Sequence, residues 1–112
     1  MQAIPFQVVR WEDVERVAHP GFTGQADWRT LLFDGLRVRV VNYSPGYLAD
    51  HWCQKGHVVY CLEGCVTTEL ETGERYVLEA GMSYIVSDGL SSHRSITETG
   101  VRLLIIDGDF LK

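Results

Sequence analysis

Turn signals recur along this chain at short intervals. Glycine and polar residues interrupt its apolar stretches about every eight to twelve residues, as at Gly64, Gly73 and Gly81. Short strands joined by tight turns are typical of an antiparallel sandwich or barrel. Helix signals are almost absent, and one short turn is predicted at residues 11–16. The spacing therefore favours an all-β fold, a double-sheet jelly roll in which two packed layers leave few strand edges exposed.

Apolar runs and apolar–polar alternation locate the individual strands. Residues 58–62 and 66–70 are expected to form a hairpin, because Gly64 can adopt a positive φ angle at little cost. We expect a loop at 19–24 and an apolar edge strand at 4–9. The other predicted strands cover residues 28–33, 36–43, 75–78, 82–86 and 101–106. The chain of 112 residues is long enough for one core, so we predict a single domain over 1–112, with a short N-terminal segment and a barrel at about 28–107.

Candidate metal ligands cluster in the segment 46–64. His51 and Cys53 are two residues apart, so on a strand their side chains would project from the same face, and His57 shares their parity. A fourth candidate, His93, would have to be brought in by the fold. Imidazole and thiolate groups suit transition metals, so we predict a divalent ion, with zinc or iron ahead of nickel and manganese. The alternative is a strand whose polar side chains simply face water.

Cys53 discriminates between kinds of metal site. As a thiolate it would favour zinc and close a tetrahedral site. As a buried thiol beside three imidazoles it would leave open positions suited to iron(II) and dioxygen chemistry. A third interpretation makes Cys53 a small buried hydrophobic side chain.

The same segment resembles the first motif of the cupin family, G-x5-H-x-H-x3,4-E-x6-G. His51 fits the first histidine, Cys53 takes the second, His57 takes the glutamate, and Gly64 falls on the closing glycine. Gly46 stands one residue closer than the motif asks. This resemblance implies a jelly-roll cupin barrel that binds a metal ion.

A looser likeness to the second cupin motif, G-x5-P-x-G-x2-H-x3-N, follows later in the chain. Gly81 and Gly89 fit its glycines, Ser87 replaces its proline, and His93 comes one residue late. The asparagine position is not filled. The run Asp50-His51-Trp52-Cys53 also resembles the motif of the small bacterial DHCW cupins, with its last two residues exchanged. That resemblance covers about residues 4–107 and supplies no reaction.

The interior of such a barrel would hold the binding pocket. Val59 and Cys61 share the parity of His57, so they would form an apolar floor beside the ligands. Tyr47, Met82 and Tyr84 would border the cavity, although aromatic residues in a small β-domain more often belong to the core. A small cavity with polar ligands at one end suits a small organic molecule.

Composition excludes several partners. The net charge is −5, and Arg37 and Arg39 are the nearest approach to a basic cluster, which argues against nucleic-acid or anionic-membrane binding. No window is as apolar as a membrane span, and the first residues do not resemble a secretory signal. We therefore expect a cytoplasmic protein with reduced cysteines. Cupins of this size usually pair through edge strands or the N-terminal segment, so the resemblance implies a homodimer.

Two functional classes remain. In the first, the protein is a mononuclear metal enzyme, such as an oxygenase or isomerase, acting on a small organic molecule. In the second, it is a non-catalytic binding or sensing protein with a structural metal. A metal-free barrel whose histidines bond one another is the remaining alternative. Glu63, Glu69 and Glu71 are expected to lie away from the site, so the sequence offers no obvious general base beyond the ligands.

Overall fold

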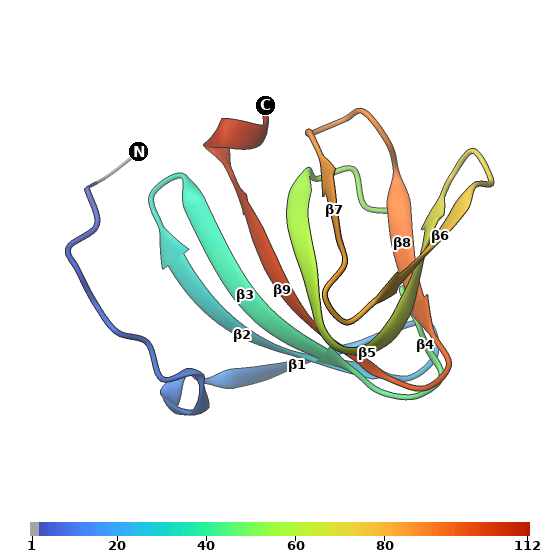
Figure 1. Ribbon diagram of the computed structural model, residues 1–112, viewed down its shortest axis with the longest axis horizontal. Helices are drawn as coiled ribbons and strands as arrows, with labels where there is room; N and C mark the ends of the chain where they lie inside the picture. The colour runs from blue at the N-terminus through green and yellow to red at the C-terminus, as the bar shows by residue number, and fades with distance from the viewer. Residues whose placement is uncertain (1–2) are drawn as a thin grey trace.

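Strongly curved antiparallel strands make up most of the chain. The computed structural model describes residues 3–112, and Figure 1 shows two layers of strands that face one another across the interior. The strands are β1 (Arg16–Pro20), β2 (Gln25–Phe33), β3 (Leu36–Tyr43), β4 (Tyr47–Leu48), β5 (His57–Leu70), β6 (Arg75–Glu79), β7 (Ser83–Val86), β8 (His93–Thr97) and β9 (Val101–Gly108). Two single 3-10 turns, η1 (Trp11–Asp13) and η2 (Asp109–Leu111), flank them. The all-β jelly-roll prediction is confirmed.

Strand β5 belongs to both layers. Its first half pairs with β9 and β7, and its second half pairs with β6 and β8. β1, β2 and β3 extend the first layer beyond β9, whereas β4 extends the second layer beyond β8. A shift in register between Cys61 and Glu63 marks the point where β5 passes from one layer to the other.

The predicted hairpin at 58–70 is wrong, because β5 runs through it without a turn. Gly64 does have a positive φ of 82°, as expected, but it lies just after the register shift between Cys61 and Glu63. A glycine with positive φ serves a β-bulge as well as it serves a tight turn. The bulge bends the strand while both of its halves stay paired in the sheet.

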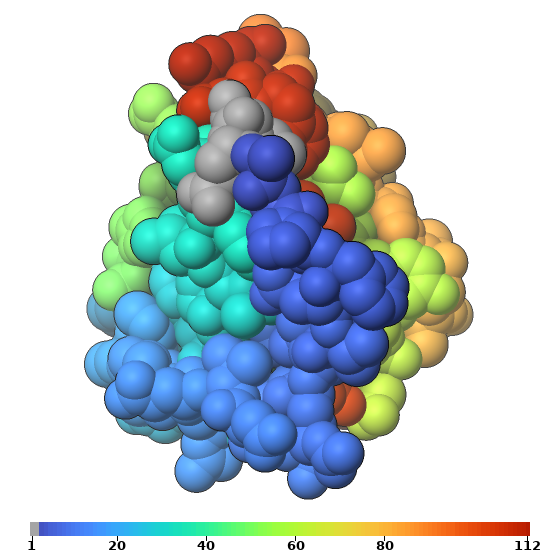
Figure 2. Space-filling model, turned by 90° about the vertical axis from the view of Figure 1, so that its left-hand side faces the viewer, coloured from blue at the N-terminus to red at the C-terminus, as the bar shows by residue number. Residues whose placement is uncertain are grey.

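The N-terminal expectations were met in part. The short turn predicted at 11–16 is present as η1, but the predicted edge strand at 4–9 is wrong, since no strand is assigned within residues 3–10. Pro5 offers no N–H for a ladder in that segment. Figure 2 shows this face of the molecule, with the N-terminal residues in dark blue running across it. The first two residues of the predicted loop at 19–24 belong instead to β1 (Arg16–Pro20) and are part of the sheet.

The core lies between the two layers. On the first half of β5, His57, Val59 and Cys61 are buried while Tyr60 is exposed, which confirms the predicted alternation. The core side chains come from β3, β5, β6 and β9: Val41, Val59, Cys61, Val66, Leu78, Val101, Leu103 and Ile105. On β9 the buried residues are two apart, so Asp107 follows Leu103 and Ile105 into the interior. A carboxylate thus reaches the same end of the barrel as His57.

Two observations concern covalent and membrane features. Within residues 3–112 the three cysteines, Cys53, Cys61 and Cys65, are free. No described helix has the length and apolar character needed to cross a membrane.

Candidate metal centre

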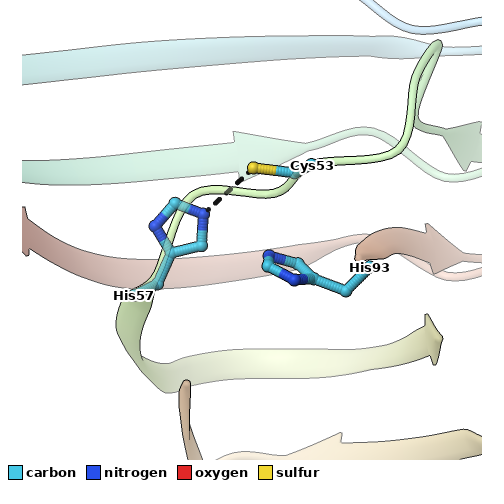
Figure 3. A group of neighbouring side chains, drawn as sticks. All are labelled: Cys53, His57 and His93. Atoms are coloured by element: carbon cyan, nitrogen blue, oxygen red, sulfur yellow. Dashed lines mark hydrogen bonds between the residues drawn. The ribbon is translucent and has the colours of Figure 1, made fainter. Parts of the chain in front are cut away.

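Three side chains from different parts of the chain meet at one end of the barrel. His57 is the first residue of β5, His93 is the first residue of β8, and Cys53 lies in the loop that connects β4 to β5. Backbone hydrogen bonds tie that loop to β8: the Cys53 amide donates to the His93 carbonyl at 2.7 Å, and the reverse bond is 3.0 Å. One ligand atom from each side chain lies within 4.8 Å of the others, and Figure 3 shows the three groups turned toward a common space.

A buried carboxylate orients His57. Its Nδ1 donates to Oδ2 of Asp107 at 3.0 Å, which leaves Nε2 facing Cys53 Sγ at 3.5 Å. Asp107 is only 2% exposed and also accepts hydrogen bonds from Arg37 and Arg39. Histidines that bind metals commonly donate their other ring nitrogen to a carboxylate, which fixes the tautomer and the ring plane. His57 therefore offers its Nε2 lone pair to the cluster.

His93 is oriented by a backbone carbonyl. Its Nδ1 donates to the Ser91 carbonyl oxygen at 2.8 Å, so the neutral ring has a lone pair on Nε2. That Nε2 is buried and has no hydrogen-bond partner among residues 3–112. A buried unpartnered acceptor is costly, and a metal ion would satisfy it. The cluster thus fits a divalent ion by its own geometry.

Cys53 is ready to act as a thiolate. Burial raises the pKa of its thiol. Hydrogen bonds with the imidazoles of His57 and His93 together have the opposite and larger effect, and the pKa falls to about 5. Thiolate, not thiol, is the metal-binding form of cysteine. Two imidazoles and one thiolate are ligands that suit zinc and other borderline transition metals.

His51 lies apart from these three residues. The predicted strand through 51 and 53 is wrong, since 49–56 is a loop in which Cys53 forms only an isolated bridge to His93. The His51 side chain is 73% exposed, and its Nδ1 is 2.6 Å from Oδ1 of Asp50. His51 lines the cavity described next but lies outside the group of close ligand atoms. Its role as a ligand stays a prediction.

A cavity of about 290 Å³ adjoins the cluster. Tyr47 and Tyr84 line it, as the sequence suggested, whereas Val59 and Cys61 lie in the hydrophobic core and outside the lining. The prediction that Met82 borders the cavity is wrong. Met82 precedes β7, is 46% exposed and does not line the cavity. The full lining is Trp28, Arg37, Arg39, Tyr43, Tyr47, Ala49, His51, Cys53, His57, Tyr84, His93, Arg94, Ser95, Leu103 and Ile105.

Sequence reasoning missed three functional candidates, namely Asp107, Arg39 and Trp28. The parity of 103, 105 and 107 on an apolar strand was a usable signal for an inward carboxylate. In the sequence, Arg39 stands out only as half of the Arg37–Arg39 pair, the nearest approach to a basic cluster. It is buried on β3, and its guanidinium carbon lies 4.4 Å from the centre of the Trp28 ring.

Comparison with solved structures shows that the fold is a known one. No protein-family model matches the sequence, and no curated protein matches it. Solved structures do match. An ectoine synthase from P. lautus is 22% identical with a TM-score of 0.74, and the match covers 92% of this chain and 78% of that one. An RmlC-like cupin from Shewanella frigidimarina is 21% identical with a TM-score of 0.72, covering 93% and 91%.

A further structure extends the same pattern. A predicted oxalate decarboxylase from Thermotoga maritima is 17% identical with a TM-score of 0.76, and the match covers 91% of this chain and 99% of that one. These likenesses confirm the expected architecture, so the protein has the fold of a small cupin. Its Cys53, His57 and His93 lie close enough together to bind a metal ion. Assignment to the DHCW-type group stays a prediction.

Proposed function

We propose that the protein is a mononuclear metal enzyme that acts on a small organic molecule, with the ion bound by Cys53, His57 and His93. The observation that carries the proposal is the position of the cluster. Three ligand atoms lie within 4.8 Å of one another beside a cavity of about 290 Å³. Catalytic sites typically use three protein ligands and leave a further position for water or substrate.

The ion would supply the reactive chemistry, and the fold supports this class of protein. A bound divalent ion provides Lewis-acid polarisation of a carbonyl or enolate oxygen, or redox chemistry with dioxygen. The thiolate of Cys53 favours zinc, whereas the two imidazoles also suit iron. Structures of similar fold include an ectoine synthase and a predicted oxalate decarboxylase.

The chain's own residues have separable roles in this proposal. Asp107 and the Ser91 carbonyl each hold a proton on Nδ1 of one histidine, so both Nε2 atoms face the cluster. His51 lines the cavity, and Asp50 accepts from its Nδ1, which leaves Nε2 free to exchange a proton with a bound molecule. A histidine oriented by a carboxylate is a common acid–base arrangement.

A second candidate function follows from the same residue. If His51 rotates inward and binds the ion, the site has four protein ligands and is closed, as structural sites are. The protein would then be a non-catalytic binding or sensing cupin. The observation that favours this alternative is that His51 lines the cavity.

Elemental analysis by mass spectrometry tests both candidates. Untagged protein is purified without chelators, and the metal content of wild type is compared with that of Cys53→Ser, His57→Ala, His93→Ala and His51→Ala. We expect occupancy to fall about tenfold or more in the first three variants and to persist in His51→Ala. His19→Ala is the control, because His19 stacks on Trp28 and lies outside the cluster.

Each outcome has a consequence. Metal that persists in His51→Ala supports the open site and justifies screening for oxygen uptake or isomerase activity. Metal that is lost in His51→Ala supports the closed site and the binding-protein alternative. Equal occupancy in all five variants would overturn the assignment of the site.

A further inference from the structure

We infer that the cavity beside the proposed metal centre binds a small organic anion through a carboxylate group, and that Arg39 and Trp28 form the recognising wall. The inference names a substrate class for the proposed enzyme. It rests on the proposed function only in treating the bound anion as the substrate of a reaction. The binding step itself depends on residues that are not metal ligands. Its evidence is the charge, hydrogen bonding and size of the cavity.

The charge of the lining is opposite to that of the chain. The sequence has 15 acidic and 10 basic residues, for a net charge of −5. Of the described residues that line the cavity, none is a carboxylate, while three are arginines: Arg37, Arg39 and Arg94. Cys53, as a thiolate, is the one negative group among these described lining residues, and the three arginines outnumber it. A concave site with an excess of one sign of charge concentrates ligands of the other sign. The cavity is therefore an anion-attracting surface on an acidic protein.

Carboxylates outside the lining balance these arginines only in part. Arg37 and Arg39 share a single carboxylate, Asp107, with bonds of 2.9 to 3.1 Å. Glu69 pairs with Arg94, whose guanidinium also stacks on Trp52 at 4.4 Å. Two guanidinium groups against one carboxylate leave a positive charge at the Arg37–Arg39 wall. A bound anion would complete the balance.

Two buried donors on the same wall lack acceptors. Within residues 3–112, Arg39 Nε and Trp28 Nε1 are buried without hydrogen-bond partners. The two side chains stack on each other, and both line the cavity. Buried donors are almost always satisfied in folded proteins, so an unpaired pair at a cavity indicates a missing acceptor. Guanidinium and indole N–H groups together match the two oxygens of a carboxylate.

The remaining walls favour an organic ligand of small size. Leu103, Ile105 and the stacked rings of Tyr43 and Tyr47 supply apolar surface. At about 290 Å³, the cavity holds roughly ten water-sized groups, since a water occupies about 30 Å³ of liquid. Free phosphate carries the charge but leaves the apolar surface uncovered. We therefore favour a carboxylic acid with a short apolar body.

Calorimetric titration of the full chain tests the inference. The probes are succinate and benzoate, each with its amide, and inorganic phosphate. We expect each acid to bind about tenfold or more tightly than its amide. Arg39→Gln should weaken acid binding by about tenfold, and Trp28→Phe, which keeps the ring but removes the N–H, by about threefold. Arg16→Gln is the control, because Arg16 is exposed on β1 and does not line the cavity.

The outcomes separate this inference from the proposed function. Acid-selective binding that depends on Arg39 or Trp28 supports it, even if elemental analysis finds no metal and the enzyme proposal fails. Metal-loaded protein that binds acids no better than amides overturns it and leaves the enzyme proposal standing. Binding of phosphate in preference to both acids also overturns it. Trp28→Phe keeps the test decisive if Arg39→Gln fails to fold, because it disturbs no ion pair.

Discussion

Nδ1 of His57 lies 3.0 Å from Oδ2 of Asp107, and the same carboxylate is bonded to Arg37 and Arg39. One buried group therefore positions a candidate metal ligand and two arginines of the cavity wall. Because a carboxylate accepts hydrogen bonds, it keeps the proton on Nδ1 and leaves Nε2 for the ion. Asp107 thus links the candidate metal centre to the proposed anion-binding wall.

Asp107→Asn is expected to damage both stability and metal binding. The change leaves Arg39 buried without its counter-charge, which typically costs about 3–5 kcal/mol of unfolding free energy. Loss of the orienting carboxylate should weaken metal binding by about 10- to 100-fold. Urea unfolding and titration against a competing chelator measure the two effects.

The matched control is Asp109→Asn. Asp109 is also near the end of the chain, but its side chain is 63% exposed and its ion pair with Lys112 spans 3.8 Å. Its substitution should change the unfolding free energy by less than about 0.5 kcal/mol and leave metal binding unchanged. Similar losses in both variants would contradict the role given to Asp107.

The pKa of Asp107 predicts how stability depends on pH. Burial opposes its ionisation, but Arg37, Arg39 and His57 hold the pKa below the ordinary value of 3.8. The unfolded chain thus binds the proton more tightly. The contribution of Asp107 to stability is complete above the ordinary value and is lost as the pH falls through the lower folded pKa. Urea unfolding at a series of acidic pH values should show a steeper loss in wild type than in Asp107→Asn, and parallel curves would refute this.

Cys53 should be the reactive cysteine of the metal-free protein. Its pKa of about 5 makes it a thiolate at pH 6, whereas burial raises the pKa of the Cys61 thiol. We expect iodoacetamide to modify Cys53 about tenfold or more faster than Cys61 at pH 6, and saturating zinc to suppress that reaction. Peptide mass spectrometry measures the rates. Unchanged labelling of Cys53 in the presence of zinc would argue against its role as a ligand.

Gly64→Ala should destabilise the sheet at the bulge of β5. The φ angle of 82° alone costs a non-glycine residue about 1–2 kcal/mol, and the added Cβ would collide with the Gly100 carbonyl oxygen. Gly73→Ala is the control: its φ is also positive, at 107°, but apart from Gly73 and its two chain neighbours no described residue has an atom within 4 Å of the position that an added Cβ would take. Thermal unfolding should show a larger loss for Gly64→Ala, and equal losses would exclude the steric contribution.

We expect the protein to be a homodimer, with the N-terminal segment in the interface. Phe6 is 95% exposed and Val8 is 85% exposed, so association would remove apolar surface from water. Light scattering on wild type and on a chain that lacks residues 1–10 measures the mass of each. A dimer that becomes monomeric on truncation supports the prediction, and a monomeric wild type contradicts it.

Much of the fold follows from local patterns in the sequence. β3, β6, β7 and β9 were predicted because alternation and flanking glycines are visible without tertiary context. β8 was not predicted, because its sequence His93–Thr97 is mostly polar. Of its two buried residues, His93 lines the cavity and Thr97 donates to the Cys65 carbonyl. The course of β5 was missed because a glycine of positive φ does not distinguish a turn from a bulge.

The site was predicted less completely than the fold. Cys53, His57 and His93 were recognised as candidates by residue type and motif order, and the fold brings them together. The prediction that His51 and Cys53 project from one face of a strand is wrong, because the chain forms a loop there. Asp107 and Arg39 were missed because each is distant in sequence from the ligands, and only the pairing of β3 with β9 brings them beside each other.

β5 has a consequence for how the protein comes apart. That one strand pairs with strands of both layers, and its first residue is His57. Because β5 links the two layers, we expect unfolding to be a single cooperative transition. The ligand set is dismantled in that same transition, so a bound ion raises the melting temperature of the whole molecule.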